Sequence, residues 1–525
     1  MYYYSTVIVK DKNLYRIESF AQKKSFFKIF VRKNMRKVKE QQMKFGEVDI
    51  ATIKFDLRSR DEIPKLLMGL QHIYCTPELR EEVFKILEGI VPKDVDNKNG
   101  RTGMELWKIL VLGTLRLNCN WEYDKIREIA NNHMTLREML GHGFFDRNSK
   151  YALQTLKDNV SLLTPEVLDK VNQIALKAGH NLVCKKKDEE LKGKCDSFVV
   201  ETNVHYPTDI NLLFDAIRKV ITLIAIICSE TGFSDWRQSR HNIRKIKKLF
   251  NKVRKLKRST SKEEKKKAKK EQAIIEAHRA YMDLNKSFLK RAEETIKMFR
   301  KKGLIKGEKL KEIERYIYHA KRQIDQIQRR IIEGETISHN EKVFSIFEEH
   351  TEWISKGKAG VPFELGLRVC ILKDQFGFIL HHMVMCNQTD DKVAVPMVQE
   401  AKKRFSNLNG CSFDKGCYSP YNFIELNKLL ESVTLPKKGK LSAADKEIEY
   451  SEEFICERKK HPAVESAINA LENHGLDLCP DHGIDGFMRY VALAVTARNI
   501  QILGTIIQKK ELRRQKRRKK HRLAA

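Results

Sequence analysis

Three acidic residues that lie far apart in the sequence are candidates for a single metal-binding site. Asp414 follows Cys-Ser-Phe at 411–413 and precedes a Lys-Gly pair, which predicts a short buried strand ending in a carboxylate at a turn. Glu465 lies in the first turn of a predicted helix, where the helix dipole favours an ionised carboxylate. Asp196 opens the apolar run Ser-Phe-Val-Val and supplies the third carboxylate. If the three acids face one crevice, they meet the needs of two-metal phosphoryl transfer.

Hard divalent cations prefer carboxylate oxygens, and two ions about 3.5–4 Å apart can activate an attacking oxygen and stabilise a leaving one. We therefore expect Asp196, Asp414 and Glu465 to be both catalytic residues and ligands of Mg²⁺, with Mn²⁺ as a substitute. Each acid also has a structural interpretation, as a turn cap or as a partner of the helix dipole. Asp209 and Glu472 are nearby acids that could be mistaken for Asp196 and Glu465.

The element that carries Glu465 has clear helix signals at both ends. Pro462 suits the first helical position, and Gly475 suits the end of the helix. Apolar residues recur at helical spacing beside Glu465, at Val464, Ala467, Ile468 and Leu471.

The other predicted elements follow the order of an RNase H-like fold, an α/β core with a mixed sheet flanked by helices. A buried strand over 195–200 precedes a large insertion, then a hairpin of strands over 367–372 and 378–384 with Gly377 in its loop. Next come a helix from Pro396 to about Phe405, the strand ending at Asp414, a helix from Ser419-Pro420 to Leu430, and a strand over 433–435. In this order the first and fourth strands are neighbours, which would place Asp196 and Asp414 side by side.

Composition limits the partners and the compartment. The chain has 525 residues and a formal net charge of +32, which indicates a polyanionic partner such as nucleic acid or an acidic membrane surface. No apolar run approaches the length of a membrane span, and Val220–Cys228 predicts a buried helix. The eleven cysteines form no CxxC pair, which favours reduced thiols in a cytoplasmic protein. A zinc site at Cys411 and Cys417 is a weaker alternative.

The chain divides into five predicted parts. Residues 1–42 form a basic extension, either an arm on DNA or an upstream-extended start, and 43–190 form an all-α domain for DNA binding or dimerisation. Three short helices in that domain, near 104–116, 123–131 and 135–140, fit a helix-turn-helix-like module or a plain packing domain. The predicted catalytic domain comprises 191–208 and 346–507, and it begins after a polar linker over 184–195.

Between the two catalytic segments, 209–345 predict a long helical hairpin, with Gly303 and Gly307 separating its arms. The basic run from Arg237 to Lys270 favours an arm that grips DNA, and a coiled coil that only mediates dimerisation is the alternative. The last part is the basic tail 508–525, for which we expect disorder.

Basic residues lie on loops and helix ends near the predicted strand ends. Contacts from such residues to phosphate would position DNA without reading its sequence. The alternative for each is a solvated surface cation. The candidates are Lys356, Lys358, Lys415, Lys437, Lys438, Lys440, Arg458, Lys460 and Arg489.

Several segments closely resemble bacterial insertion-sequence transposases of the DDE class. The resemblance lies in Asp-Ser-Phe-Val-Val-Glu-Thr-Asn from Asp196, Ser-Phe-Asp-Lys-Gly around Asp414, and His-Pro-Ala-Val-Glu-Ser-Ala-Ile-Asn-Ala-Leu around Glu465. Arg-Tyr-Val-Ala-Leu-Ala from Arg489 and Gly-Arg-Thr-Gly-Met-Glu-Leu-Trp near residue 100 fit the same pattern. It covers roughly 95 to 505. His461 stands where some relatives carry Arg, which leaves open which residue holds the DNA phosphate.

The resemblance implies an RNase H-like core, Mg²⁺-dependent cleavage at the ends of a mobile element, and joining of the exposed 3′-hydroxyl to target DNA. It also implies a homodimer or higher homo-oligomer on double-stranded DNA, without membrane association, in the bacterial cytoplasm at the nucleoid. The alternatives are a catalytically inactive DNA-binding protein, an RNase H-like nuclease without strand transfer, and, least favoured, a membrane-surface protein.

Overall fold

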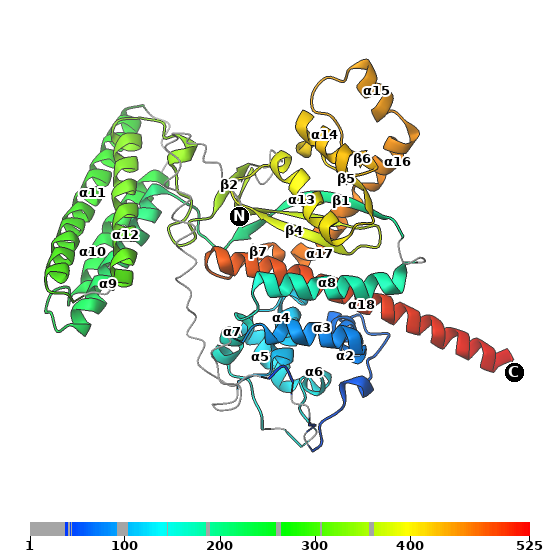
Figure 1. Ribbon diagram of the computed structural model, residues 1–525. Helices are drawn as coiled ribbons and strands as arrows, with labels where there is room; N and C mark the ends of the chain where they lie inside the picture. The colour runs from blue at the N-terminus through cyan, green and yellow to red at the C-terminus, as the bar shows by residue number, and fades with distance from the viewer. Residues whose placement is uncertain are drawn as a thin grey trace, which may run out of the picture. The chain divides into compact units, whose positions relative to one another are not determined.

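The computed structural model contains two compact units (Figure 1). Unit 1 comprises Met1–Arg116, Trp121–Gly179 and Ile500–Ala525, and unit 2 comprises Leu117–Asn120 and His180–Asn499. The expectation for the extension 1–42 lies outside the described residues, apart from 37–39 and 42. The structure describes residues 37–39, 42–43, 45–91, 103–143, 145–146, 148–184, 189–258, 264–304, 307–355 and 362–524.

Unit 1 is helical, which confirms the helical character expected of 43–190. Its helices are capped by the signals that the sequence carries, for example Asp61, whose side chain accepts a hydrogen bond from the backbone of Ile63 at 2.8 Å. After the short 3₁₀ turn η2 (Ile50–Thr52), the helices are α2 (Glu62–Cys75), α3 (Pro77–Glu88), α4 (Leu106–Asn118), α5 (Tyr123–Asn132), α6 (Met134–Met139), α7 (Leu153–Val160) and α8 (Pro165–Val183).

The C-terminal helix α18 (Gly483–Ala524) corrects two expectations. The basic tail 508–525, expected to be disordered, continues the apolar helix through Ala524, because Lys and Arg are good helix formers and the preceding turns are already packed. In unit 1 this packing is close: a side chain added to Gly504 would meet the backbone oxygen of Lys65 at 1.7 Å.

The second correction concerns length. Among the described residues, one helix, Gly483–His521, is long and apolar enough by length and composition to cross a membrane. Core helices pass the same test, and 72% of its apolar window is buried inside the protein, so the membrane evidence is weak.

Unit 2 contains a mixed open sheet flanked by helices, as expected. Its order is β2-β3-β1-β5-β6, with β4 beside β3 and β7 beside β1. The long strand β1 is antiparallel to β3 and parallel to β5, and β5 is parallel to β6. The strands are β1 (Leu191–Thr202), β2 (Glu352–Ser355), β3 (Phe363–Lys373), β4 (Ile379–Met385), β5 (Leu408–Phe413), β6 (Ser432–Thr434) and β7 (Leu478–Cys479).

The first strand begins earlier than expected. Residues 191–194 were expected in a polar linker, but they pair with β5 and belong to β1. Leu191, Gly193 and even Lys194 are buried, so only Lys192 is exposed in this part of the strand. The sequence did not predict this part of the strand because lysine is rarely buried, so Lys192 and Lys194 suggested an exposed linker.

The hairpin between β3 and β4 has the expected turn. Gly377 has a φ of 98°, and the fully buried Asp374 accepts backbone hydrogen bonds from Phe376 and Phe378, both at 2.9 Å. The helix after β4 was expected to begin at Pro396. It begins six residues earlier, as α13 (Asp390–Arg404), with two acids in its first turn and the Pro inside. A helix was also expected from Ser419-Pro420 to Leu430, and α14 (Pro420–Leu429) confirms it.

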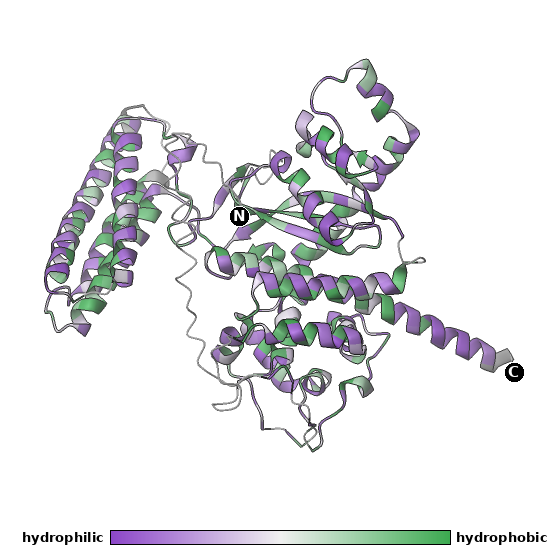
Figure 2. Cartoon of the chain, in the orientation of Figure 1, coloured by the Kyte–Doolittle hydropathy of each residue, from purple (hydrophilic) through white to green (hydrophobic). Residues whose placement is uncertain are grey.

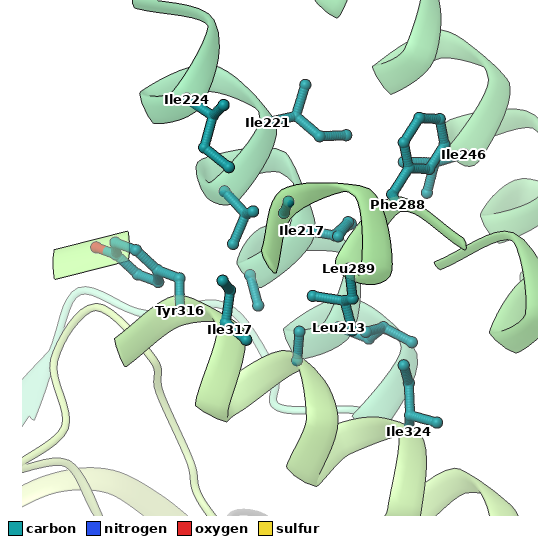
Figure 3. Close-up of a cluster of buried hydrophobic side chains, with 14 of the residues drawn as sticks. Leu213, Ile217, Ile221, Ile224, Ile246, Phe288, Leu289, Tyr316, Ile317 and Ile324 are labelled. Atoms are coloured by element: carbon teal, nitrogen blue, oxygen red, sulfur yellow. The ribbon is translucent and has the colours of Figure 1, made fainter. Parts of the chain in front are cut away.

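In the described part of the insertion, four long α-helices take the place of the expected two-armed hairpin. They are α9 (Asp209–Glu230), α10 (Ser239–Arg258), α11 (Glu264–Lys301) and α12 (Gly307–Ile327). All four contribute to one apolar core, in which Ile217, Ile246, Leu289 and Ile317 are buried (Figure 3). The buried helix expected at 220–228 is confirmed as part of α9. The break at Gly303 is also confirmed, with a φ of 63°.

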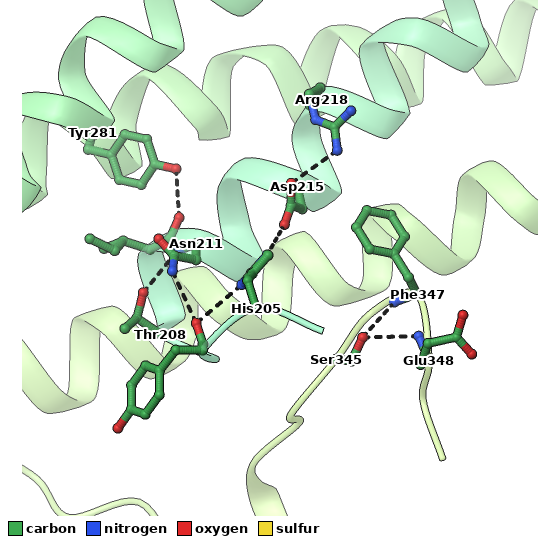
Figure 4. Close-up of polar contacts among 11 residues, drawn as sticks. His205, Thr208, Asn211, Asp215, Arg218, Tyr281, Ser345, Phe347 and Glu348 are labelled. Carbon is green, nitrogen blue, oxygen red and sulfur yellow. Dashed lines mark hydrogen bonds and ion pairs between the residues drawn. The ribbon is translucent and has the colours of Figure 1, made fainter. Parts of the chain in front are cut away.

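A polar network joins the end of β1 to the insertion (Figure 4). His205 contacts the buried Asp215 of α9 at 2.5 Å, and Arg218 donates to the other carboxylate oxygen at 3.1 Å. The hydrogen bond to Asp215 raises the pKa of His205 above its usual value. Tyr281 of α11 donates to the backbone oxygen of Ile210 at 3.1 Å. These bonds fix the start of α9 relative to the strand that carries Asp196.

Candidate active site

Asp196 and Asp414 lie on neighbouring parallel strands. Cys195 of β1 is paired with Phe413 of β5, and each aspartate directly follows its paired residue. Asp196 is partly buried, and its carboxylate accepts a hydrogen bond from the backbone of Ser197 at 2.7 Å. Asp414 is exposed at the end of β5, where it caps the 3₁₀ turn η5 (Lys415–Cys417). The sequence pattern of an acid at a strand end is therefore found in the structure.

Glu465 reaches the same region from a helix. It lies in the first turn of α17 (Ala463–Leu471), which follows α16 (Glu452–Lys460), and its side chain is exposed. The apolar stripe beside it is buried, as expected, and α17 packs against β1. The residues of this stripe are Val464, Ala467, Ile468 and Leu471.

A fourth acid, Asp390, joins the three expected ones. It opens α13, and the hydroxyl of Ser197 donates to its carboxylate at 2.5 Å. The sequence signal was the pair Asp390-Asp391 after Thr389, a hydroxyl residue that suits a helix N-cap. Placing the helix start at Pro396 left this signal inside a loop.

The charges of these acids act on one another. Burial and, to a smaller extent, the nearby carboxylates of Asp414, Asp390 and Glu465 together raise the pKa of Asp196 to about 6, against the backbone hydrogen bond from Ser197, which lowers it. Like charges that share a site disfavour ionisation in this way. The four acids are therefore close enough to form one electrostatic cluster at this part of the sheet.

Cations that the sequence did not single out lie beside the acids. Lys194 precedes Asp196 by two residues, so the two side chains share a face of β1, and Lys194 is only 8% exposed. Lys373 is paired with Lys194 across the sheet and donates to the backbone oxygen of Ala463 at 2.9 Å. Lys373, Lys194 and the first turn of α17 thus bring positive charge next to the carboxylates.

His461, four residues before Glu465, belongs to the same region. Its Nδ1 lies 3.0 Å from the Ser412 hydroxyl. Burial lowers the pKa of His461, Asp414 and Glu465 oppose that shift, and Lys194 adds to it. A His at this position therefore interacts with the acidic cluster and with the buried lysine.

The residues expected to contact DNA differ in their exposure and in whether they already have a hydrogen-bond or ion-pair partner. Lys356 and Lys358 lie outside the described residues. Lys415, Lys440 and Arg458 are exposed, and Lys438 is exposed but donates to the backbone oxygen of Gly416 at 2.7 Å.

The remaining three expected contacts have acidic partners. Lys437 pairs with Asp445 at 2.5 Å, Lys460 with Glu457 at 2.9 Å, and Arg489 with Asp481 at 3.1 Å. A phosphate would have to compete with a carboxylate at each of them, so they are weaker candidates than Lys415, Lys440 and Arg458.

The donor set fits a hard divalent cation in its chemistry. Carboxylate oxygens from four acids are the ligands that Mg²⁺ and Mn²⁺ prefer. Within the described part of the chain, however, no three His, Cys, Asp or Glu side chains are gathered closely enough to hold an ion. Binding would require the exposed carboxylates of Asp414 and Glu465 to turn toward Asp196. None of the eleven cysteines forms a disulfide, and Cys411 and Cys417 are buried thiols whose pKa burial raises.

Comparison with known proteins gave no match among protein-family models, curated proteins or solved structures. What the site can do is therefore inferred from its own residues and contacts. The acids have the oxygen donors that divalent ions prefer, and such ions could stabilise the charge that develops when a phosphodiester is cleaved. The buried and exposed cations beside the acids could bind the phosphate oxygens.

Proposed function

We propose that this protein is a DNA transposase of the DDE class with an RNase H-like core. The observation that carries the proposal is that Asp196, Asp414 and Glu465, from β1, the end of β5 and α17, lie close enough for the charges of Asp414 and Glu465 to raise the pKa of Asp196. The sheet order supports it: β1 is central, antiparallel to β3 and parallel to β5, and these are the strands that the sequence predicts as neighbours in that core. The net charge of +32 supports a nucleic-acid partner.

Asp196, Asp414 and Glu465 would hold the divalent ions, with Asp390 positioned through Ser197 as a neighbour that adds negative charge. Bound Mg²⁺ would supply activation of the attacking oxygen and charge neutralisation at the leaving oxygen. Asp196 must be ionised to bind a metal ion. Because its pKa is raised to about 6, it is mostly ionised only above about pH 6.

The cations then have a separate role. Lys415 and Lys438 lie next to Asp414, where they can contact the phosphates that flank the scissile bond. Lys194 and His461 lie near Ser412, which is close to Asp414 at the end of β5, and their charge would favour a phosphate oxygen close to Asp196 and Glu465. Together they orient a DNA strand so that its phosphodiester faces the carboxylates.

Joining of DNA ends tests the proposal. Purified full-length protein is incubated with Mg²⁺, a plasmid and a labelled duplex ending in the inverted repeat that flanks the gene, pre-cleaved to a 3′-hydroxyl. We expect the label to appear in plasmid DNA with wild-type protein and not with Asp196→Asn. Cleavage without joining would contradict transposition and favour a nuclease, and DNA binding without either reaction would favour an inactive DNA-binding protein.

A further inference from the structure

Helix α10 of the insertion carries an unusual charge distribution. The helix contains no acidic residue along its length. In the part whose side chains are described, every Lys and Arg is exposed. These cations are Arg240, Arg244, Lys245, Lys247, Lys248, Lys252, Arg254 and Lys255.

The apolar side of α10 fixes which way these cations face. Ile246, Phe250 and Val253 are buried in the core shared with α9, α11 and α12. Phe250 stacks on Phe214 of α9 with ring centroids 5.1 Å apart. Figure 2 shows the alternation of hydrophilic and hydrophobic residues along the insertion helices. The basic side of α10 is therefore held outward by packing.

The α10 cations lack the acidic partners that other cations of the insertion have. None of the eight forms an ion pair within the described residues. Elsewhere in the insertion, Lys309 pairs with Glu230 at 2.7 Å and Lys321 with Glu293 at 2.5 Å, and Arg300 pairs with Glu314. Repulsion between like charges at i,i+4 spacing opposes helix formation. An anionic partner that bound between these cations would reduce their repulsion, so the surface is suited to one.

We propose that this surface of α10 binds the phosphate backbone of duplex DNA without reading its sequence; the inference rests on the proposed function because it takes DNA as the polyanion. The helix has 20 residues and is about 30 Å long. Arg240, Arg244, Lys248 and Lys252 recur every four residues, or about 6 Å, close to the rise of about 7 Å along the DNA axis over two successive phosphates of one strand. This surface is separate from the acids that would cut DNA.

An anionic membrane is a less suitable partner. Helices that lie on membranes insert an apolar face into the lipid. The apolar face of α10 is already occupied by the core of the insertion, and its exposed residues are cationic or polar.

A pair of matched triple variants tests the inference in the full chain. The first is Arg244→Gln, Lys248→Gln and Lys252→Gln on α10. The control is Arg300→Gln, Lys309→Gln and Lys321→Gln, which removes the same charge from the same insertion but from cations that already have acidic partners. The affinity for a labelled duplex of arbitrary sequence is measured by fluorescence anisotropy over a range of salt concentrations, and circular dichroism checks that both variants fold.

We expect the α10 triple to lower the slope of log affinity against log salt by about 2.7, and the control triple to lower it by less than about 1. Equal effects of the two triples would show that only net charge matters and would overturn the inference, as would no effect of either. Binding of anionic phospholipid vesicles that the α10 triple abolishes, with duplex binding unchanged, would also overturn it.

The same variants separate this inference from the proposed function. If wild-type protein joins DNA ends but the α10 triple binds duplex normally, the surface assignment fails and the transposase proposal stands. If wild-type protein joins no DNA ends but the α10 triple loses duplex binding, the transposase proposal fails and the surface assignment stands.

Discussion

The acidic site and the basic surface of α10 are both clusters of like charge, but they differ in burial. Around Asp196, burial and three neighbouring carboxylates raise the pKa to about 6. The eight described cations of α10 are exposed, where water and salt screen their repulsion. The acidic cluster, through its partly buried Asp196, thus carries an electrostatic penalty that a bound cation can relieve, whereas the exposed basic surface of α10 acts at longer range on a polyanion.

The largest expected effect is on the acidic cluster. Asp196→Asn, Asp414→Asn and Glu465→Gln should each lower metal-dependent DNA cleavage by about 10³-fold or more, because each removes a metal-binding carboxylate. Single-turnover cleavage of a pre-formed end duplex measures the rate. Glu472→Gln, which changes the neighbouring acid after α17, is the matched control and should react like wild type. A 10-fold or smaller loss in Asp414→Asn would contradict a shared site.

The pH dependence should follow the raised pKa of Asp196. Ionisation is needed for metal binding, so the cleavage rate should fall about tenfold per pH unit as the pH drops below about 6. Rates measured at several Mg²⁺ concentrations below saturation over about pH 5 to 8 would show the midpoint. Bound metal favours the ionised carboxylate and shifts the midpoint downward as Mg²⁺ rises. A midpoint independent of Mg²⁺ would show that another group controls the rate.

Stability without metal should change in the opposite sense to activity. Because the folded state binds a proton at Asp196 more tightly than the unfolded state does, the free energy of unfolding should decrease as pH rises from about 4 to about 6. Asp196→Asn removes this penalty and should raise the free energy of unfolding at pH 7 by about 1–3 kcal/mol. Urea unfolding in EDTA measures it. Destabilisation by this variant would indicate that the carboxylate has a stabilising partner.

The smallest expected effect is on duplex binding, from single substitutions on the basic surface of α10. Lys248→Gln should lower the salt dependence of duplex binding by about 0.9 and leave the free energy of unfolding nearly unchanged. Lys321→Gln, which breaks the ion pair with Glu293, is the control and should leave the salt dependence close to wild type. A single α10 cation that strongly affected stability would mean that it packs as well as attracts.

Much of the sheet could be predicted from the sequence because strand ends and turns have strong local signals. Gly377, Asp414 and the apolar stripe that precedes Leu471 each mark an element boundary or a buried face without reference to distant residues. The order of these elements then placed Asp196 beside Asp414 through the parallel pairing of β1 and β5.

Features that depend on tertiary packing were missed. Lys194 is buried within the sheet, which could not be foreseen from a polar residue, and Asp390 was missed because Pro396 suggested a helix start that the structure does not use. The four-helix insertion appeared as a hairpin because the lysines of α10 obscure the spacing of Ile246, Phe250 and Val253. Helical continuation through the basic tail likewise follows from the packed turns before it.

Calorimetric titration with Mn²⁺, in the absence of DNA, tests the central claim that Asp196, Asp414 and Glu465 form one site. Wild-type protein and Glu472→Gln should bind Mn²⁺ with the same affinity, and Asp196→Asn, Asp414→Asn and Glu465→Gln should each lose that binding. Unchanged Mn²⁺ affinity in any one of these three variants would show that its acid lies outside the metal site and would contradict the account.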